Sequence, residues 1–135
     1  MNKLILLLLA ATLACTSFTA PSESGEYKLV TLNERALPVA LDRVDYANSY
    51  VYVIAGGTLV LRGDRSYTET LSVRSYHSTL LVDSYQTVED GNYAVSGSTI
   101  TFTAKAGYSY HGSLVNGNLN YSTESGLWRA FYRKL

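Results

Sequence analysis

The chain has 135 residues, a length suited to one domain, and 47% of them are hydrophobic, which permits a packed core. Eleven basic and eleven acidic residues give a formal net charge of zero, without a run of like charge. This balance argues against a nucleic-acid groove, which needs clustered Lys and Arg, and against a polybasic membrane-surface patch. Twelve tyrosines are the unusual feature of the composition, and Tyr favours the half-buried surface of a β-sheet.

The first residues have the composition of an export signal. Lys3 supplies a positive charge, and Leu4 to Leu13 form an uncharged apolar run. This run is too short for a membrane-spanning helix, which needs about 20 residues. We therefore predict a signal peptide over residues 1–14. A buried strand or helix of the mature domain is the alternative.

Cys15 is the only cysteine and stands where this signal ends, so it has no disulfide partner within the chain. The stretch from Ala11 to Cys15 resembles a bacterial lipobox, with the small Ala14 before the cysteine. The resemblance implies lipidation of Cys15 and a membrane anchor made of acyl chains. The alternative is ordinary cleavage at an A-x-A-like site formed by Thr12 and Ala14, which would give a secreted protein.

The residues after the cysteine complete the predicted domain plan. In Gram-negative lipoproteins an Asp after the cysteine resembles an inner-membrane retention signal. Here the residue is Thr16, which points to the outer membrane of the cell envelope, facing the periplasm. Residues 15–25 are rich in Ser and Thr and are predicted to be a flexible tether. Residues 26–135 are predicted to form the folded domain.

The rest of the chain consists of short segments in which apolar and polar residues alternate, a period that predicts β-strands. Asn116-Gly117 is the strongest hairpin signal, because a type I′ turn needs positive φ at both central residues. Ser96-Gly97, Gly63 to Arg65 and Asp90-Gly91 are predicted as further turns. Gly56-Gly57 is predicted to end a strand. The predicted strands cover residues 26–32, 49–54, 58–62, 66–74, 79–89, 92–95, 98–103, 108–115, 118–122 and 127–135.

Eight to ten closely spaced strands and no convincing helix predict an all-β fold, a single antiparallel up-and-down meander. Such a meander avoids exposed edges most simply by closing into a small barrel. With about eight strands, the interior is just large enough for side chains or one small ligand. A membrane-spanning barrel is the alternative, but it needs strands of about 9–11 residues, longer than most of those predicted here.

Three segments, YKLVTLNERALP, GGTLVLRGDRSYTETLSV and GNYAVSGSTITFTA, resemble small bacterial lipocalin-like lipoproteins that mostly lack an assigned function. The barrel plan resembles that of the calycins. Lipocalins open on a Gly-x-Trp motif whose ring is packed by an Arg near the end of the barrel. Here Gly25-Glu26-Tyr27 takes this place, and the resemblance implies that Arg129 or Arg133 stacks on the Tyr27 ring. Such motifs imply a fold and not an activity.

No pattern typical of a catalytic or metal site occurs in the sequence. His77 and His111 are the only histidines, and no Cys–His spacing or carboxylate cluster accompanies them, so neither a metal nor a cofactor is predicted. His111 is interpreted as a solvent-facing strand residue. A G-x-S-x-G elbow, a P-loop and a dinucleotide-binding glycine pattern are all absent. We therefore predict that the protein is not an enzyme.

Glu69 is the most informative charge, because it shares a strand face with Tyr67, Leu71 and Val73 that the pattern turns inward. A carboxylate there would hold the polar head of a ligand or pair with an inward Arg. The alternative is an outward face or a position at the rim, where the charge stays hydrated, since burying an unpaired charge is very costly.

Tyr108 and Tyr110 share a face of their own strand, and they either line a cavity or fill the core. The predicted ligand-binding residues are therefore Glu69, Tyr67, Tyr108 and Tyr110. We expect the barrel to bind a small apolar or amphipathic molecule. The alternative is a non-enzymatic structural or protein-interaction module of the cell envelope, with a filled barrel.

Overall fold

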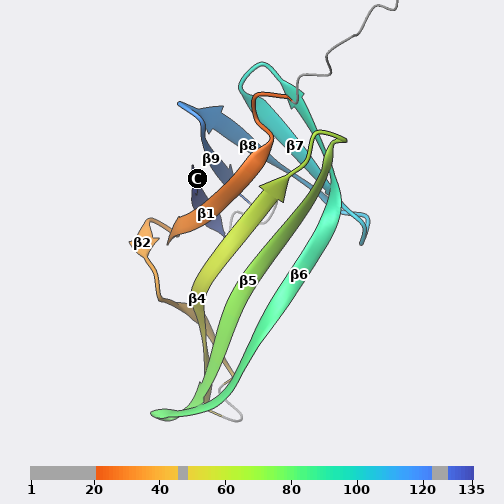
Figure 1. The fold of residues 1–135 in the computed structure, drawn as a ribbon. Helices are drawn as coiled ribbons and strands as arrows, with labels where there is room; N and C mark the ends of the chain where they lie inside the picture. The colour runs from red at the N-terminus through yellow and green to blue at the C-terminus, as the bar shows by residue number, and fades with distance from the viewer. Residues whose placement is uncertain (1–20, 46–48, 123–127) are drawn as a thin grey trace, which may run out of the picture.

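The computed structural model describes residues 21–45, 49–122 and 128–135, so Cys15 and the predicted signal peptide lie outside the described residues. The described chain forms ten β-strands (Figure 1) and contains no helix, hence none long and apolar enough to cross a membrane. The strands are β1 Gly25–Leu32, β2 Arg35–Ala36, β3 Val39–Asp45, β4 Tyr50–Leu61, β5 Ser66–His77, β6 Leu80–Ser96, β7 Thr99–Ala104, β8 Ser109–Val115, β9 Asn118–Ser122 and β10 Arg129–Lys134.

The strands form one antiparallel sheet that closes on itself. From β3 to β10 each strand pairs with the next along the chain, and β1 lies beside β10. A further pairing of β1 with β4 completes a ring of eight strands, while β2 and β3 extend the sheet outside this ring. The structure therefore confirms the predicted all-β, up-and-down meander closed into a small barrel.

β4 runs without a break through Gly56-Gly57, where the sequence predicts the end of one strand and the start of another. A bulge between Ile54 and Gly56 takes the place of a turn. Because a bulge bends a strand and increases its twist, the two parts of β4 face different neighbours. The first part pairs with β3, and residues 58–61 pair with β1.

β6 likewise passes through Asp90-Gly91 without the predicted turn. Gly91 serves a different need, the close approach of β7, because a Cβ at this position would lie 2.2 Å from the carbonyl oxygen of Thr103. From Gly91 onward β6 pairs with β7, whereas residues 80–90 have β5 on one side and no described strand on the other. A ribbon of β3, β4, β5 and β6 therefore extends beyond the closed ring (Figure 1).

Side chains fill the interior of the closed ring. The Phe102 ring lies at the centre of an aromatic group, with its centroid 5.0 Å from the centroids of Tyr67 and Tyr110. Stacked and edge-to-face pairs of this kind add to the stability gained by burial. Buried aliphatic side chains complete this part of the core: Leu59, Leu61, Ile100 and Leu119.

Tyr27 is fully buried, and its hydroxyl donates to the carbonyl oxygen of Glu23 at 2.6 Å. The cation over its ring is Lys134, whose Nζ lies 5.8 Å from the ring centroid. Lys134 is placed there by the pairing of β1 with β10, in which it lies opposite Tyr27. The implied stacking of Arg129 or Arg133 is therefore wrong, and Arg129 forms an exposed ion pair elsewhere.

The residues just before β1 contact the barrel, although the sequence assigns them to the tether. The Lys134 ammonium donates to the carbonyl oxygen of Ser22 at 2.6 Å. Glu23 forms an ion pair with Arg65, in the connection between β4 and β5. The start of the described chain is thus held at the end of the barrel opposite the β5–β6 turn (Figure 1).

Replacing Gly91 by alanine is expected to destabilise the barrel, because the new Cβ would meet the backbone of Thr103 at 2.2 Å. Forcing extra volume into a packed region usually costs about 1–3 kcal/mol. Gly56→Ala is the matched control, since a Cβ there would meet no heavy atom within 4 Å, and it should change stability by less than about 1 kcal/mol. Urea unfolding measures both effects, and equal stability of the two variants would contradict the close-approach explanation.

Candidate functional site

A cavity of about 320 Å³ lies where the closed ring gives way to the ribbon of β3 to β6. Its volume is at the lower end of the range of about 300–1,000 Å³ that is typical of ligand pockets. Aliphatic and aromatic side chains form most of its wall, and Glu69 is its only charged residue among the described ones. The lining residues are Leu29, Leu32, Leu41, Tyr52, Ile54, Glu69, Leu71, Val73, Tyr85, Thr87, Tyr121, Trp128, Ala130 and Tyr132.

Glu69 is turned into the barrel by the alternation of β5, which also buries Tyr67 and Val73. Its side chain is only 7% exposed, so the inward position is correct and the hydrated rim is not. No described Arg or Lys forms an ion pair with it. Instead, the hydroxyl groups of Tyr121 and Tyr132 both donate to its Oε1 atom.

The second carboxylate oxygen of Glu69, Oε2, receives no hydrogen bond from the described residues. Among the described residues, every fully buried side-chain nitrogen or oxygen atom has a hydrogen bond. An oxygen atom without one, such as Oε2, is therefore not fully buried. Oε2 is therefore accessible from the hollow space that Glu69 lines. It is an acceptor available to a bound molecule.

Burial raises the pKa of Glu69, because a charged carboxylate loses its hydration. The hydrogen bonds from Tyr121 and Tyr132 act in the opposite direction, and the nearby charge of Glu89 adds to the increase. Burial, followed by the charge of Glu69, also raises the pKa of both tyrosines. Both hydroxyls therefore keep their protons and remain donors.

A second carboxylate, Glu89, lies directly opposite Glu69 in the pairing of β5 with β6. Its Oε1 atom accepts hydrogen bonds of 2.6 Å from the hydroxyls of Tyr67 and Tyr110, and its Oε2 atom accepts one from Tyr108. The structure therefore brings three of the predicted site residues together on Glu89. Tyr67 and Tyr110 fill the core next to the cavity and do not line it, while Tyr108 is 49% exposed.

A second hollow, of about 530 Å³, adjoins the cavity, since Glu69, Leu71 and Thr87 line both. Tyr108 and the loop that contains Lys105 form its outer wall. Glu69 thus lies between an apolar cavity on one side and a more polar hollow on the other. This arrangement suits a molecule with an apolar body and a polar head.

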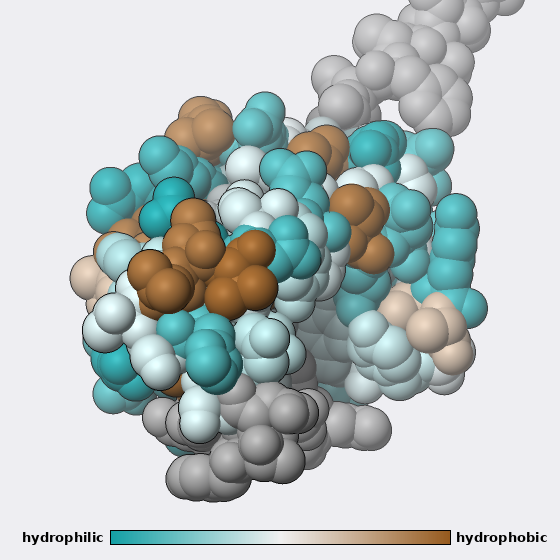
Figure 2. All heavy atoms as spheres, turned by 90° about the horizontal axis from the view of Figure 1, so that it is seen from below, coloured by the Kyte–Doolittle hydropathy of each residue, from teal (hydrophilic) through white to brown (hydrophobic). Residues whose placement is uncertain are grey.

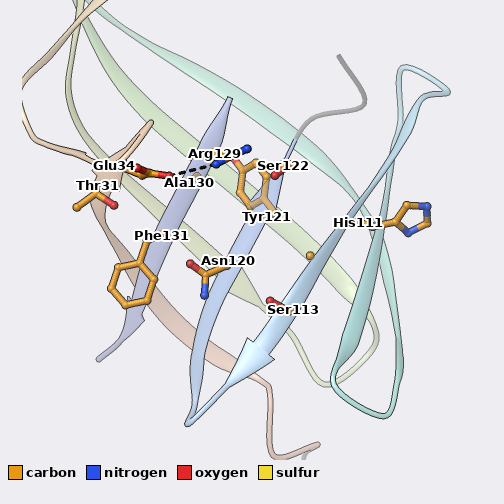
Figure 3. A pocket seen from close by; sticks show the side chains of 11 residues that line it. Thr31, Glu34, His111, Ser113, Asn120, Tyr121, Ser122, Arg129, Ala130 and Phe131 are labelled. Carbon is orange, nitrogen blue, oxygen red and sulfur yellow. Dashed lines mark hydrogen bonds and ion pairs between the residues drawn. The ribbon is translucent and has the colours of Figure 1, made fainter. Parts of the chain in front are cut away.

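A third hollow, of about 390 Å³, lies on the outer face of β8, β9 and β10 (Figure 3). The ring of His111 points away from the other labelled side chains in Figure 3, and its Nδ1 lies 3.0 Å from the Thr101 hydroxyl. His77 lies at the exposed end of β5, against the Tyr50 ring. Neither histidine lines the cavity, and within the described ranges no group of three His, Cys, Asp or Glu side chains forms a metal site.

The sequence interpretation missed Tyr121 and Tyr132, which hold Glu69, and Glu89, which gathers the other tyrosines. Alternation gave a usable signal for the first two, because Tyr121 shares a face with Leu119, and Tyr132 with Ala130. For Glu89 the signal was weaker. Its place opposite Glu69 follows only once the register of the β5–β6 pair is known.

Replacing Glu69 by glutamine is expected to change how stability depends on pH. The raised pKa in the folded state means that the favourable contribution of the protonated acid is complete below the ordinary value of 4.5 and is lost as pH rises through the folded-state pKa. Glutamine keeps an oxygen for both hydroxyls but does not titrate. Relative to the wild type, the free energy of unfolding of E69Q should therefore increase from about pH 4 to pH 8, as measured by urea unfolding. A difference that does not vary with pH would contradict the assignment.

Comparison of the chain with known protein families, curated proteins and solved structures found no match. The resemblance to lipocalin-like lipoproteins therefore stays a prediction.

Proposed function

We propose that the protein is a binding protein that holds one small amphipathic molecule in the cavity below the closed ring. The observation that carries this proposal is Glu69, a residue only 7% exposed beside an apolar cavity, with one carboxylate oxygen that no described residue engages. Burial of such a group is costly unless it is paired. A ligand that donates to Oε2 would supply the missing partner while its apolar body fills the cavity.

We also propose that this binding takes place in the cell envelope, with the protein held at the outer membrane by lipidated Cys15. Support comes from the apolar run before Cys15 and from the lipobox resemblance. The end of the barrel where the described chain begins would then lie nearest the membrane. The β5–β6 turn, at the opposite end, would point into the periplasm (Figure 1).

The outer edge of β6 favours a second function, association of two copies of this chain. No described strand pairs with residues 80–88 on this edge. Four apolar residues of the segment are each more than half exposed: Leu80, Leu81, Val82 and Val88. Figure 2, seen from below relative to Figure 1, shows apolar groups gathered in a patch. A long apolar edge of this kind pairs readily with another strand.

A second copy fits this edge because the segment complements itself. In a two-fold antiparallel pairing centred on Ser84, Asp83 of one copy lies opposite Tyr85 of the other, and Leu80 lies opposite Val88. Asp83 is the only charged residue between 80 and 88, so no like charges face each other. Such an isologous interface closes as a dimer.

Thr87 is exposed and lines both the cavity and the adjoining hollow. Replacing it by tryptophan is expected to weaken ligand binding, because the larger side chain would occupy space that the ligand needs. The neutral fluorophore N-phenyl-1-naphthylamine serves as the probe, and its fluorescence rises on entering an apolar site. We expect saturable binding by the wild type and roughly tenfold weaker binding by T87W, a loss of about 1.4 kcal/mol.

Gln86→Trp is the matched control for this experiment. Gln86 is the exposed neighbour of Thr87 on the opposite face of β6 and lines neither hollow. Its replacement should leave the affinity for the fluorophore within about twofold, since strand neighbours point to opposite faces. Absence of saturable binding by the wild type, or equal losses in the two variants, would contradict a ligand in this cavity.

Replacing Val82 by lysine is expected to shift a dimer toward the monomer, because a charge on an edge strand opposes pairing. Light scattering coupled to size-exclusion chromatography, over a range of concentrations, measures this shift. Val115→Lys is the matched control, because Val115 and Val82 are similarly exposed, at 51% and 53%. Val115 lies on β8 and not on the outer edge of β6, so this variant should leave the dimer unchanged. A wild type that stays monomeric at every concentration would exclude the second copy.

A further inference from the structure

We propose that the molecule held in the cavity carries a protonated amine, which donates a hydrogen bond to Oε2 of Glu69. This inference rests on the proposed binding function and specifies the chemical class of its ligand. The ligand would be a primary ammonium on one short apolar chain or ring. Four features of the described residues support this class over alcohols and carboxylates.

The first feature is that the polar groups facing the cavity from Glu69 and its two partners are acceptors. A tyrosine hydroxyl has a single hydrogen, and Tyr121 and Tyr132 both direct theirs to Oε1 of Glu69. What remains for a ligand is Oε2 and the lone pairs of the two hydroxyl oxygens. An ammonium, which has three donors and no acceptor, matches this set.

The second feature is the sign of the local charge. Glu69 and Glu89 lie opposite each other on β5 and β6, and among the described residues the cavity wall contains no Arg, Lys or His. A ligand carboxylate in the cavity would add a third negative charge, and Lys105 lines the adjoining hollow but not the cavity. A ligand cation would instead be attracted to both glutamates.

The third feature is that the second glutamate is already occupied. Both oxygens of Glu89 accept tyrosine hydroxyls, from Tyr67 and Tyr110 on one oxygen and from Tyr108 on the other. Oε2 of Glu69 is therefore the one carboxylate oxygen of this pair that no described residue engages. The geometry therefore offers this one oxygen atom to a single hydrogen-bond donor group of the ligand.

The fourth feature is the aromatic part of the wall. The rings of Tyr121 and Tyr132 are stacked with their centroids 5.9 Å apart next to Glu69, and Trp128 lines the same cavity. Aromatic faces attract cations, most strongly where water is excluded. These rings would contact the ammonium or the first carbons of its chain.

Three molecules with the same eight-carbon body test the inference: octylammonium, octanol and octanoate, each used below its micelle-forming concentration. Each competes with N-phenyl-1-naphthylamine for the wild-type protein near pH 7. We expect octylammonium to displace the fluorophore at a concentration at least about tenfold lower than the concentration of octanol that is needed, because one charge-assisted hydrogen bond provides an affinity difference of this size. Octanoate should be the weakest competitor.

Glu69→Gln tests the residue. This variant should lose the preference for octylammonium over octanol and keep its affinity for octanol within about threefold. The matched control is Glu26→Gln, which removes an exposed carboxylate from β1 and should leave the preference intact. If E69Q fails to fold, the order of the three competitors on the wild type still decides.

The two proposals fail in different ways. If the fluorophore binds but octylammonium and octanol compete equally, or octanoate competes best, the amine inference is overturned and the binding function stands. Retention of the octylammonium preference in E69Q would also overturn it. If neither the fluorophore nor any of the three molecules binds, both proposals are overturned.

Discussion

The burial of one carboxylate constrains how this barrel is assembled. Glu69 lies inside on β5, and the hydroxyls that solvate it belong to tyrosines 52 and 63 residues further along the chain, on β9 and β10. An unpaired charge in an apolar interior is very costly. β5 therefore holds Glu69 inward at low cost only after the ring has closed and β9 and β10 lie across the interior. The polar contacts of this one residue depend on the closure of the whole meander.

The unequal lengths of the strands determine where the closed ring ends. β4, β5 and β6 have 12, 12 and 17 residues, whereas β9 has only 5. The long strands exchange partners partway along, at the bulge in β4 and at Gly91 in β6, and the ring ends there. Beyond this point the ribbon continues without the short strands beside it. The cavity and the unpaired edge of β6 are thus two consequences of the same mismatch.

Alternation and turn residues were enough to predict the closed meander, because both are local properties of a strand and its hairpin. The errors in the predicted strand ends occurred at glycines, Gly56-Gly57 and Gly91, which were interpreted as turn residues. Gly91 allows the close approach of β7, and Gly56 lies at a bulge. The sequence alone does not distinguish a glycine in either role from a glycine in a turn. For the site, the inward face of Glu69 was predictable from its neighbours on β5. Alternation also indicates that Tyr121 and Tyr132 face inward, but it does not predict their hydrogen bonds to Glu69, because these form across the barrel between distant strands.

The cost of Glu69 is an argument about function. An apolar residue of similar volume would fill this position with no charge to solvate, and such replacements in protein interiors are often neutral or stabilising. Two tyrosine hydroxyls offset part of the cost but leave the pKa of the acid raised, so solvation in the interior stays incomplete. A second acid directly opposite adds to the cost. A structural role would be filled better by leucine, whereas a bound cation would gain from each of the terms that makes this carboxylate unfavourable in its absence.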